Sequence, residues 1–383
     1  MNSTTSANSG STALAFKDQT IVQTLAKNIT SLANQLAELK KRPLQIMEVC
    51  GGHTHAIYRF GLDQLLPDTL EFVHGPGCPV CVLPPEAVDN AIALAQQPNT
   101  ILASFGDTLR VPGSANSLLQ AKALGADVRV LYSPMDALQL ATQHPDKRII
   151  FFAIGFDTTM PGIAYSIQQA YQQQIPNLFF YCHHIRLLPT LEGLFLQPNP
   201  VKLDGLIGPG HVSMVIGSKV YEDFVTKTDL PLVIAGFEPV DLLDALYQIL
   251  LQIEQGESRV ENRYTRVVQE QGNQAALKSI HEVFDMDIDA NWRGLGEVSG
   301  SGVHIKDKYR AYDAQQFINK EEANKHSETQ LEPIYCQQVM TGQLRPTQCP
   351  KFNSECIPEH PLGALMVSSE GACAAYYQYK IRA

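Results

Sequence analysis

Apolar residues repeat along the chain with two different periods. Between residues 21 and 39 they recur at steps of three and four, which predicts the apolar face of a helix that ends before Pro43. From there to about residue 250, short apolar runs alternate with helical patterns. This alternation is typical of α/β layers with parallel sheets. The runs that predict buried strands are LQIMEV, LEFVHG, TILASFG, VRVLYS, RIIFFAIGF, LFFYCHH, LDGLIGPG and LPLVIAGFEP.

The α/β region is long enough for two units. We expect a first α/β domain over residues 43–147 and a second, similar one over residues 148–255, both Rossmann-like with parallel sheets. A strand leading into Gly75-Pro76-Gly77-Cys78 and one leading into Gly208-Pro209-Gly210-His211 fit a duplication. Shared turn chemistry explains this short match equally well.

The ends of the chain have a different character. After residue 255 the sequence becomes polar and interrupted by glycines, and it ends in a cysteine-rich tail. We expect residues 256–383, completed by the helix over residues 21–42, to form a third, mainly helical or irregular domain. Residues 1–20, rich in Ser, Thr and Asn, are expected to be a disordered extension.

The composition and the net charge limit the kinds of partner that the protein is expected to bind. Of the 383 residues, 44% are hydrophobic and 18% are charged, and the formal net charge is −10. This balance favours a packed globular protein. No cluster of Lys and Arg offsets the acidic charge, so we expect neither a nucleic acid nor a membrane as partner.

The sequence also predicts the cellular compartment of the protein. The first twenty residues lack a basic start followed by an apolar run, and no later stretch approaches 18 uninterrupted apolar residues. We therefore expect a soluble, cytoplasmic protein. Eight cysteines are too few for a disulfide scaffold in a chain this long, and clustered cysteines in a reducing compartment more often bind metal or perform redox chemistry.

Four cysteines, Cys336, Cys349, Cys356 and Cys373, lie in the tail with the spacing C-x12-C-x6-C-x16-C. Four thiolates can hold either Zn²⁺ or a [4Fe–4S] cluster. The wide spacing, the interspersed prolines and the absence of a CxxC pair among them favour the cluster, because each iron of the cubane takes one thiolate from its own direction. A zinc site and unligated buried thiols remain the alternatives.

A second group of candidates follows the first predicted strand. Cys50 and His53, separated by Gly51 and Gly52, place a thiol and an imidazole at a strand end, where open α/β sheets bind their ligands. The glycines allow close backbone approach, and the two side chains are a soft and a borderline ligand suited to iron. The alternative is a simple Gly-Gly turn with histidines that cap the next helix.

Cys78 and Cys81 form a CxxC where a further helix is expected to begin. The helix dipole at that position lowers thiol pKa values and favours thiolates. A CxxC supports reversible dithiol–disulfide chemistry and can also bind a metal, whereas two inert buried thiols are the alternative.

Other polar residues lie at expected strand ends, where each is more often a helix cap or turn residue than a catalytic group. Cys182, beside two histidines in an apolar strand, is interpreted as an ordinary buried thiol. The strand-end residues are Asp107, Asp157, His211 and Glu238.

Six motifs in one order along the chain resemble a known family. They are CGGHTH (50–55), HGPGCPVC (74–81), FGDTLRVPGS (105–114), GPGHVS (208–213), GFEPVD (236–241) and MVSSEGACAAYY (366–377). From about residue 43 to its end the chain resembles the HypD family, whose members mature [NiFe]-hydrogenases. The leading residues look like an extension outside the family pattern, and the segment over residues 181–189 matches it least well.

The resemblance implies a function and a set of roles. HypD-like proteins act as scaffold and redox protein in assembling the Fe(CN)2(CO) group, in complex with a small HypC-like partner and with cyanide supplied by a HypE-like donor. Carried over by position, Cys50 would bind the iron of the nascent group with His53 beside it, and Cys78 with Cys81 would be the redox-active pair. The fold it implies is two similar α/β domains and a third that binds a cluster. The cysteines that would hold this [4Fe–4S] cluster are Cys336, Cys349, Cys356 and Cys373.

Such a protein is not an ordinary turnover enzyme, and two other classes of function compete with it. The first is an iron–sulfur-dependent thiol–disulfide oxidoreductase in which the cluster feeds Cys78 and Cys81 to reduce a disulfide substrate. The second is a binding module stabilised by zinc, which would be colourless and contain neither iron nor sulfide.

Overall fold

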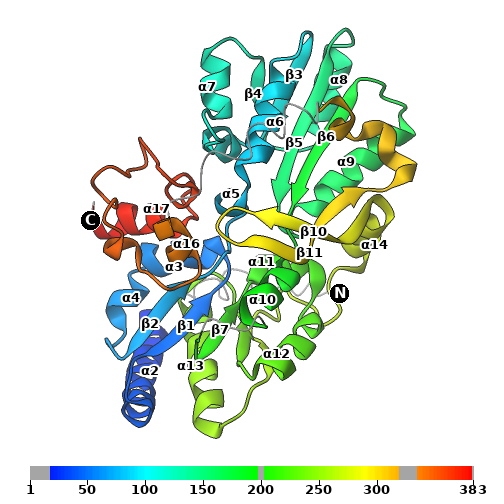
Figure 1. Ribbon diagram of the computed structural model, residues 1–383. Helices are drawn as coiled ribbons and strands as arrows, with labels where there is room; N and C mark the ends of the chain where they lie inside the picture. Colours follow the sequence, from blue (N-terminus) through cyan, green and yellow to red (C-terminus); the bar gives the residue numbers. More distant parts are fainter. Residues whose placement is uncertain (1–17, 197–201, 319–333, 382–383) are drawn as a thin grey trace, which may run out of the picture.

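The computed structural model describes residues 18–196, 202–318 and 334–381. Two parallel sheets form its framework (Figure 1). Sheet A has the order β2-β1-β7-β8-β9, and sheet B has the order β4-β3-β5-β6. The strands of sheet A are β1 (Leu44–Glu48), β2 (Leu70–His74), β7 (Gly205–Gly208), β8 (Leu232–Ile234) and β9 (Val260–Asn262). Those of sheet B are β3 (Thr100–Ser104), β4 (Val128–Val130), β5 (Arg148–Gly155) and β6 (Leu178–His184).

Parallel α/β sheets are therefore confirmed, and each of the eight apolar runs contains a strand. The pairing of the strands corrects the expected division at residues 147 and 148. The chain leaves sheet A after β2, builds all of sheet B, and returns to sheet A with β7. Apolar runs identify strands, but they do not show which strands pair, because every buried parallel strand has the same pattern.

Helices connect the strands and cover the sheets. Within the described ranges, no helix is long and apolar enough to cross a membrane. The helices are α2 (Gln19–Lys40), α3 (Gly51–Arg59), α4 (Leu62–Leu65), α5 (Pro79–Val82), α6 (Pro85–Ala95), α7 (Leu118–Ala123), α8 (Asp136–Gln143), α9 (Met160–Gln172), α10 (Leu187–Phe195), α11 (Gly210–Ile216), α12 (Glu222–Thr228), α13 (Pro239–Gln255), α14 (Gln274–Val283), α16 (Ile334–Met340) and α17 (Ala372–Tyr376).

The N-terminal helix α2 belongs to sheet A rather than to the tail. It packs on α13, and Ile29, Leu32 and Leu36 share a core with residues of sheet A and α13. This corrects the expectation that residues 21–42 complete the third domain. The helix begins earlier than expected, because the side chain of Asp18 accepts hydrogen bonds from the first backbone N–H groups. Of the expected disordered extension, residues 1–17 lie outside the described residues.

The C-terminal part contains an antiparallel hairpin that was not among the predicted elements. Strands β10 (Phe284–Trp292) and β11 (Gly296–Ile305) pair with each other, and β11 contacts α10 and β6. In Figure 1 this hairpin lies between the two sheets, and the tail (orange and red) lies beside α3. Cys81, Leu365 and Cys373 lie in one core with residues of both sheets, so the tail is packed against the α/β framework.

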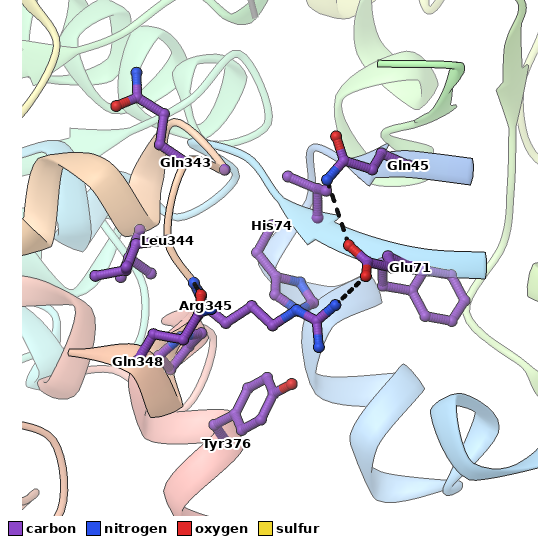
Figure 2. A pocket seen from close by; sticks show the side chains of 13 residues that line it. Gln45, Glu71, His74, Gln343, Leu344, Arg345, Gln348 and Tyr376 are labelled. Carbon is purple, nitrogen blue, oxygen red and sulfur yellow. Dashed lines mark hydrogen bonds and ion pairs between the residues drawn. The ribbon is translucent and has the colours of Figure 1, made fainter. Parts of the chain in front are cut away.

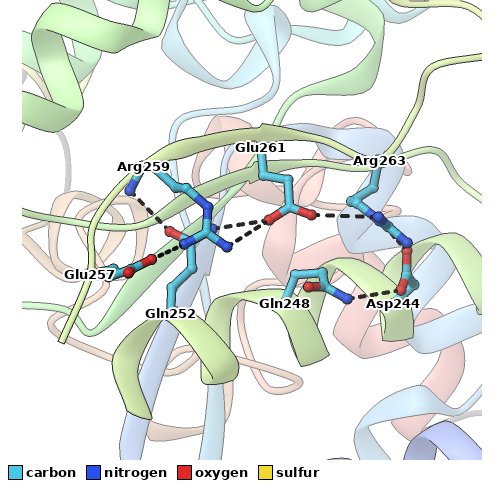
Figure 3. Close-up of polar contacts among 7 residues, drawn as sticks. All are labelled: Asp244, Gln248, Gln252, Glu257, Arg259, Glu261 and Arg263. Atoms are coloured by element: carbon cyan, nitrogen blue, oxygen red, sulfur yellow. Dashed lines mark hydrogen bonds and ion pairs between the residues drawn. The ribbon is translucent and has the colours of Figure 1, made fainter. Parts of the chain in front are cut away.

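The outer edge of sheet A is protected by charge. Arg259, Glu261 and Arg263, in and around edge strand β9, join Glu257 and Asp244 in a row of ion pairs (Figure 3). Alternating charges on an exposed edge strand hinder pairing with another chain. The charged edge at β9 in Figure 3 is therefore suited to remain exposed to solvent.

Candidate functional site

Cys50 lies where the strand order of sheet A reverses. From β1 the chain continues to β2 on one side, and β7 pairs with β1 on the other. The carboxyl ends of β1 and β7 therefore form the crevice in which open α/β sheets bind ligands. Cys50 follows β1 and His211 follows β7, and the distance from Cys50 Sγ to His211 Nδ1 is 3.9 Å. The structure thus adds His211 to the group at Cys50.

Glycines allow three segments to meet at this point. Cys50 is the N-cap of α3, and a Cβ atom on Gly51 would lie 2.5 Å from the Cβ atom of Glu370. A Cβ atom on Gly77 would lie 2.4 Å from the backbone nitrogen of Cys50. Real Cβ atoms do not come this close, so the loop before α5 and the tail reach Cys50 only because these positions have no side chain.

A buried carboxylate fixes the backbone of Cys50. Glu48 Oε2 accepts a hydrogen bond from the backbone N–H of Cys50 at 3.0 Å, and Oε1 accepts one from the Thr54 hydroxyl. His74 Nδ1 lies 2.6 Å from Oε1, and the other ring nitrogen of His74 bonds to the Tyr58 hydroxyl. These side chains lock the N-terminus of α3 in place.

The hydrogen-bonded chain leads outward from Cys50 to a pocket. His74 lines a pocket of about 370 Å³ between edge strand β2 and the tail (Figure 2). Arg345 of the tail forms an ion pair with Glu71 of β2 across this pocket, and Tyr376 lies beside it. The pocket therefore lies at the interface between the tail and sheet A.

Burial dominates the protonation of Cys50. It raises the pKa of the thiol to about 12, and the charges of Glu48 and Glu370 act in the same direction. At neutral pH the thiol is protonated, so a metal ion that binds Cys50 must displace a proton.

His53, three residues after Cys50 in α3, has a free lone pair. Its Nε2–H donates to the backbone carbonyl of Ala235 at 3.3 Å, and within the described residues Nδ1 has no hydrogen-bond partner. Burial lowers the pKa of His53 to about 4, which keeps the ring neutral. The rings of His53 and His211 both pack on Phe237, with centroid distances of 4.8 and 3.9 Å. A neutral imidazole with an unused nitrogen is the form that binds metals.

The CxxC lies between this crevice and the tail. Cys78 is the N-cap of α5, and Cys81 Sγ lies 3.7 Å from the backbone oxygen of Ala364. Burial raises the pKa of Cys81 well above its usual value, and a hydrogen bond with the Cys78 thiol raises it further. The expected lowering by the helix dipole is therefore wrong for Cys81, because desolvation outweighs the dipole of a four-residue helix.

The four tail cysteines come together. They surround a cavity of about 30 Å³ whose other walls include Phe352 and Met366. The backbone N–H of Leu362 donates to the sulfur of Cys356 at 3.4 Å. Within the described residues, no three His, Cys, Asp or Glu side chains are arranged to hold a single metal ion. The cysteines around the cavity are Cys336, Cys349, Cys356 and Cys373.

One loop of the tail lies close to Cys50 and Cys81 and leads to Cys373. A Cβ atom on Gly371 would lie 3.2 Å from Cys81 Sγ, and Cys373 follows two residues later. The Glu370 carboxylate raises the pKa of both Cys50 and Cys81. Its own pKa is raised by burial, by Asp107 and by Glu48, in that order. Glu370 was not among the predicted site residues, although a carboxylate inside the MVSSEGAC motif was a visible signal.

The remaining strand-end candidates have structural contacts. Asp107 accepts a hydrogen bond from the Ser368 hydroxyl at 3.1 Å, which ties the tail loop to sheet B. Asp157 accepts one from the backbone of Leu187, and Glu238 is the N-cap of α13. Cys182 is buried in β6, and burial raises the pKa of its thiol, in agreement with its interpretation as an ordinary buried cysteine.

Comparison with known proteins places the chain in a family. The family model described as "HypD: Hydrogenase formation hypA family" matches residues 20–380. The chain is 48% identical over 359 residues to the hydrogenase maturation factor HypD of Escherichia coli (strain K12), covering 94% of this chain and 95% of that protein. It is also 48% identical over 365 residues to the hydrogenase maturation factor HypD of Rhodobacter capsulatus, covering 95% and 97%. The chain therefore belongs to the HypD family.

Proposed function

We propose that the protein is a scaffold and redox factor that assembles the Fe(CN)2(CO) group of [NiFe]-hydrogenases. The observation that carries this proposal is the loop over residues 368–373, which places Glu370 beside Cys50 and Gly371 beside Cys81 and leads directly to Cys373. A ligand crevice, a dithiol and a four-thiol cavity thus adjoin one another. The names of the relatives, which are hydrogenase maturation factors, support the same assignment.

In this proposal the iron is the cargo, and Cys50 binds it after losing its proton. The unused Nδ1 of His53 is suited to act beside the thiol. Cyanide and CO are strong-field ligands that need an electron-rich low-spin iron, and thiolate donation helps to supply it. The raised pKa of Cys50 makes binding of the iron a proton-releasing step.

A [4Fe–4S] cluster is the proposed resident cofactor of the tail. Its four thiolate ligands would be Cys336, Cys349, Cys356 and Cys373, which surround one cavity with apolar walls. When bound, it would supply one-electron transfer. Cys78 and Cys81 would exchange protons and electrons as a dithiol, with Cys81 packed against the loop that carries Cys373.

The proposed partners follow from the cargo. One thiol and its imidazole neighbours leave most iron positions open, so a small HypC-like chaperone would supply further ligands at Cys50 and a HypE-like donor would deliver cyanide. Assembly of this kind takes place in the cytoplasm, where thiols stay reduced.

A second function is favoured by the hydrogen bond between the Cys78 and Cys81 thiols, which makes them neighbours. A thiol–disulfide oxidoreductase would use this pair to reduce a disulfide substrate without any partner. Turnover with such a substrate, in a protein that shows no CN or CO bands, would support that function instead.

The test is infrared spectroscopy of the complex. The chain is produced with a HypC-like partner and the cyanide-supplying proteins, purified without oxygen, and examined for CN and CO stretches. We expect the bands in the wild type, their loss in Cys50→Ala, and their retention in Cys182→Ala, in which the buried cysteine that changes lies in β6. Bands of full intensity in Cys50→Ala would refute the role of this thiol.

A further inference from the structure

A cavity of about 490 Å³ lies at the carboxyl end of sheet B. Asp157, which follows β5, and Arg186, which follows β6, line one side of it. Helix α14 and the segment after α11 close the other side. The volume is within the range of small-molecule sites, roughly 300 to 1,000 Å³, and the position is where α/β sheets bind ligands. The site proposed above does not use this cavity.

The walls combine an apolar surface with basic groups. Three basic side chains, Arg186, Lys219 and His281, reach the cavity from three separate segments. Most of the rest of the wall is apolar. The apolar side chains are Leu188, Pro189, Ile216, Leu277, Ile280 and Met286, together with Val220.

Arg186 is held in place but keeps donors unused. Its Nη1 donates to the backbone oxygen of Gly300 at 3.0 Å and pairs with the Asp287 carboxylate. Within the described residues, its Nε and Nη2 donate no hydrogen bond. A fixed guanidinium with free N–H groups is suited to a planar or tetrahedral anion.

The two acidic groups on the wall lie close to the basic side chains, Asp157 near Arg186 and Glu270 near Lys219. Asp157 is buried and its carboxylate accepts the backbone N–H of Leu187, while burial raises its pKa. Glu270 is exposed and lies 3.9 Å from Lys219. Both carboxylates therefore have partners within the protein, and the donors left for a ligand are Nε and Nη2 of Arg186.

We propose that this cavity binds a small organic anion, with an apolar body against the wall of α14 and a carboxylate or phosphate group on Arg186. Lys219 would assist from the rim. The proposal is independent of the function proposed above, because none of the groups it uses contacts Cys50 or the tail cysteines.

The cavity is close to the Cys50 crevice through one helix. Helix α11 carries His211 in its first turn and Ile216 at its end, a separation of about 8 Å at 1.5 Å per residue. Between the two places, the Ser213 hydroxyl lies 3.2 Å from the hydroxyl of the fully buried Tyr221. A molecule bound in the cavity would thus be separated from the Cys50 thiol by about the length of α11.

The test uses the full chain and three probes: benzoate, phenyl phosphate and the neutral benzyl alcohol. Binding is measured by saturation-transfer NMR and calorimetry. We expect at least one anion to bind in a saturable manner, about tenfold more tightly than benzyl alcohol. Benzoate and phenyl phosphate together distinguish a carboxylate site from a phosphate site.

Variants locate the binding. Arg186→Gln, which removes the charge, and Leu277→Trp, which fills the cavity, should each weaken the bound anion about tenfold. Lys219→Gln, an exposed change that leaves the core intact, should weaken it about threefold, and Lys227→Gln on α12 is the matched control without effect. The proposal is overturned if neither anion binds, if the alcohol binds as tightly as the anions, or if Lys219→Gln and every folded cavity variant bind like the wild type.

Discussion

At the scale of single residues, burial and neighbouring charge control the cysteines of the site. Burial is the largest cause of the raised pKa of Cys50, Cys81 and Cys373. Sequence spacing identified these thiols but predicted the opposite pKa shift for Cys81, because spacing shows the start of a helix and not the depth of burial. Glu48 and Glu370 were also missed: Glu48 is local to Cys50, whereas Glu370 approaches the start of α3 only after the tail has packed there.

Glu370→Gln should make two thiols more reactive. Removal of its negative charge lowers the pKa of Cys50 and of Cys81, so we expect the thiolate fraction to rise about threefold. The measurement is the rate of iodoacetamide labelling at pH 8, followed by peptide mass spectrometry on metal-free protein. Glu254→Gln, an exposed change on α13, is the control. Equal labelling rates in Glu370→Gln and wild type would show that the carboxylate does not act on these thiols.

At the scale of elements, apolar runs predicted strands better than they predicted sheets. One sheet crosses the expected division at residue 147, because β3 pairs with β5 and so joins β4 and β6 in sheet B through contacts that no local pattern encodes. The β10–β11 hairpin was overlooked although a local signal existed. In FDMDIDANW, apolar and polar residues alternate, which is the period of a half-buried strand.

Gly77 allows the loop before α5 to pack closely against the start of α3. In Gly77→Ala the new methyl group would lie 2.4 Å from the backbone nitrogen of Cys50, so the loop must move. We expect a loss of about 1–3 kcal/mol in the free energy of unfolding, measured by urea titration. Gly162→Ala in α9 is the matched control, because among the described residues its methyl group meets only Pro134, at 3.5 Å, and alanine favours a helix by about 1 kcal/mol. Equal stability of the two variants would contradict the close approach.

At the scale of the whole molecule, the tail connects sheet A and sheet B. Arg345 pairs with Glu71 of β2, Ser368 bonds to Asp107 after β3, and Cys373 lies in the core shared by both sheets. A cofactor that tightened the tail would therefore stabilise the whole chain.

Loss of one tail thiol should thus have two effects. In Cys373→Ser, purified without oxygen, we expect iron and acid-labile sulfide to fall together and the melting temperature to fall with them. Cys182→Ser is the control that should keep both elements. Full iron and sulfide content in Cys373→Ser would exclude this residue as a ligand, and zinc in place of iron in the wild type would exclude the cluster.

Three histidines, the buried His53 and His184 and the half-buried His183, should make the stability of the molecule depend on pH. Burial lowers the pKa of His53 and His183 to about 4 and that of His184 to about 3. The unfolded chain takes up the same protons near pH 6.5. Between pH 6.5 and 4 the unfolded state therefore binds more protons, so stability falls as the pH falls, by up to about 1.4 kcal/mol per pH unit for each histidine.

His184→Phe isolates one of these contributions. The ring packs near Phe284, and within the described residues neither of its nitrogens has a hydrogen-bond partner, so a phenyl ring can take its place. We expect urea titrations at pH 6.5 and pH 5 to differ by about 2 kcal/mol less in this variant than in the wild type. His360→Gln, at an exposed position in the tail, should leave the difference unchanged. If His184→Phe kept the full pH dependence, His184 would have to be protonated inside the fold, and the neutral, unpartnered ring at the end of β6 would be refuted.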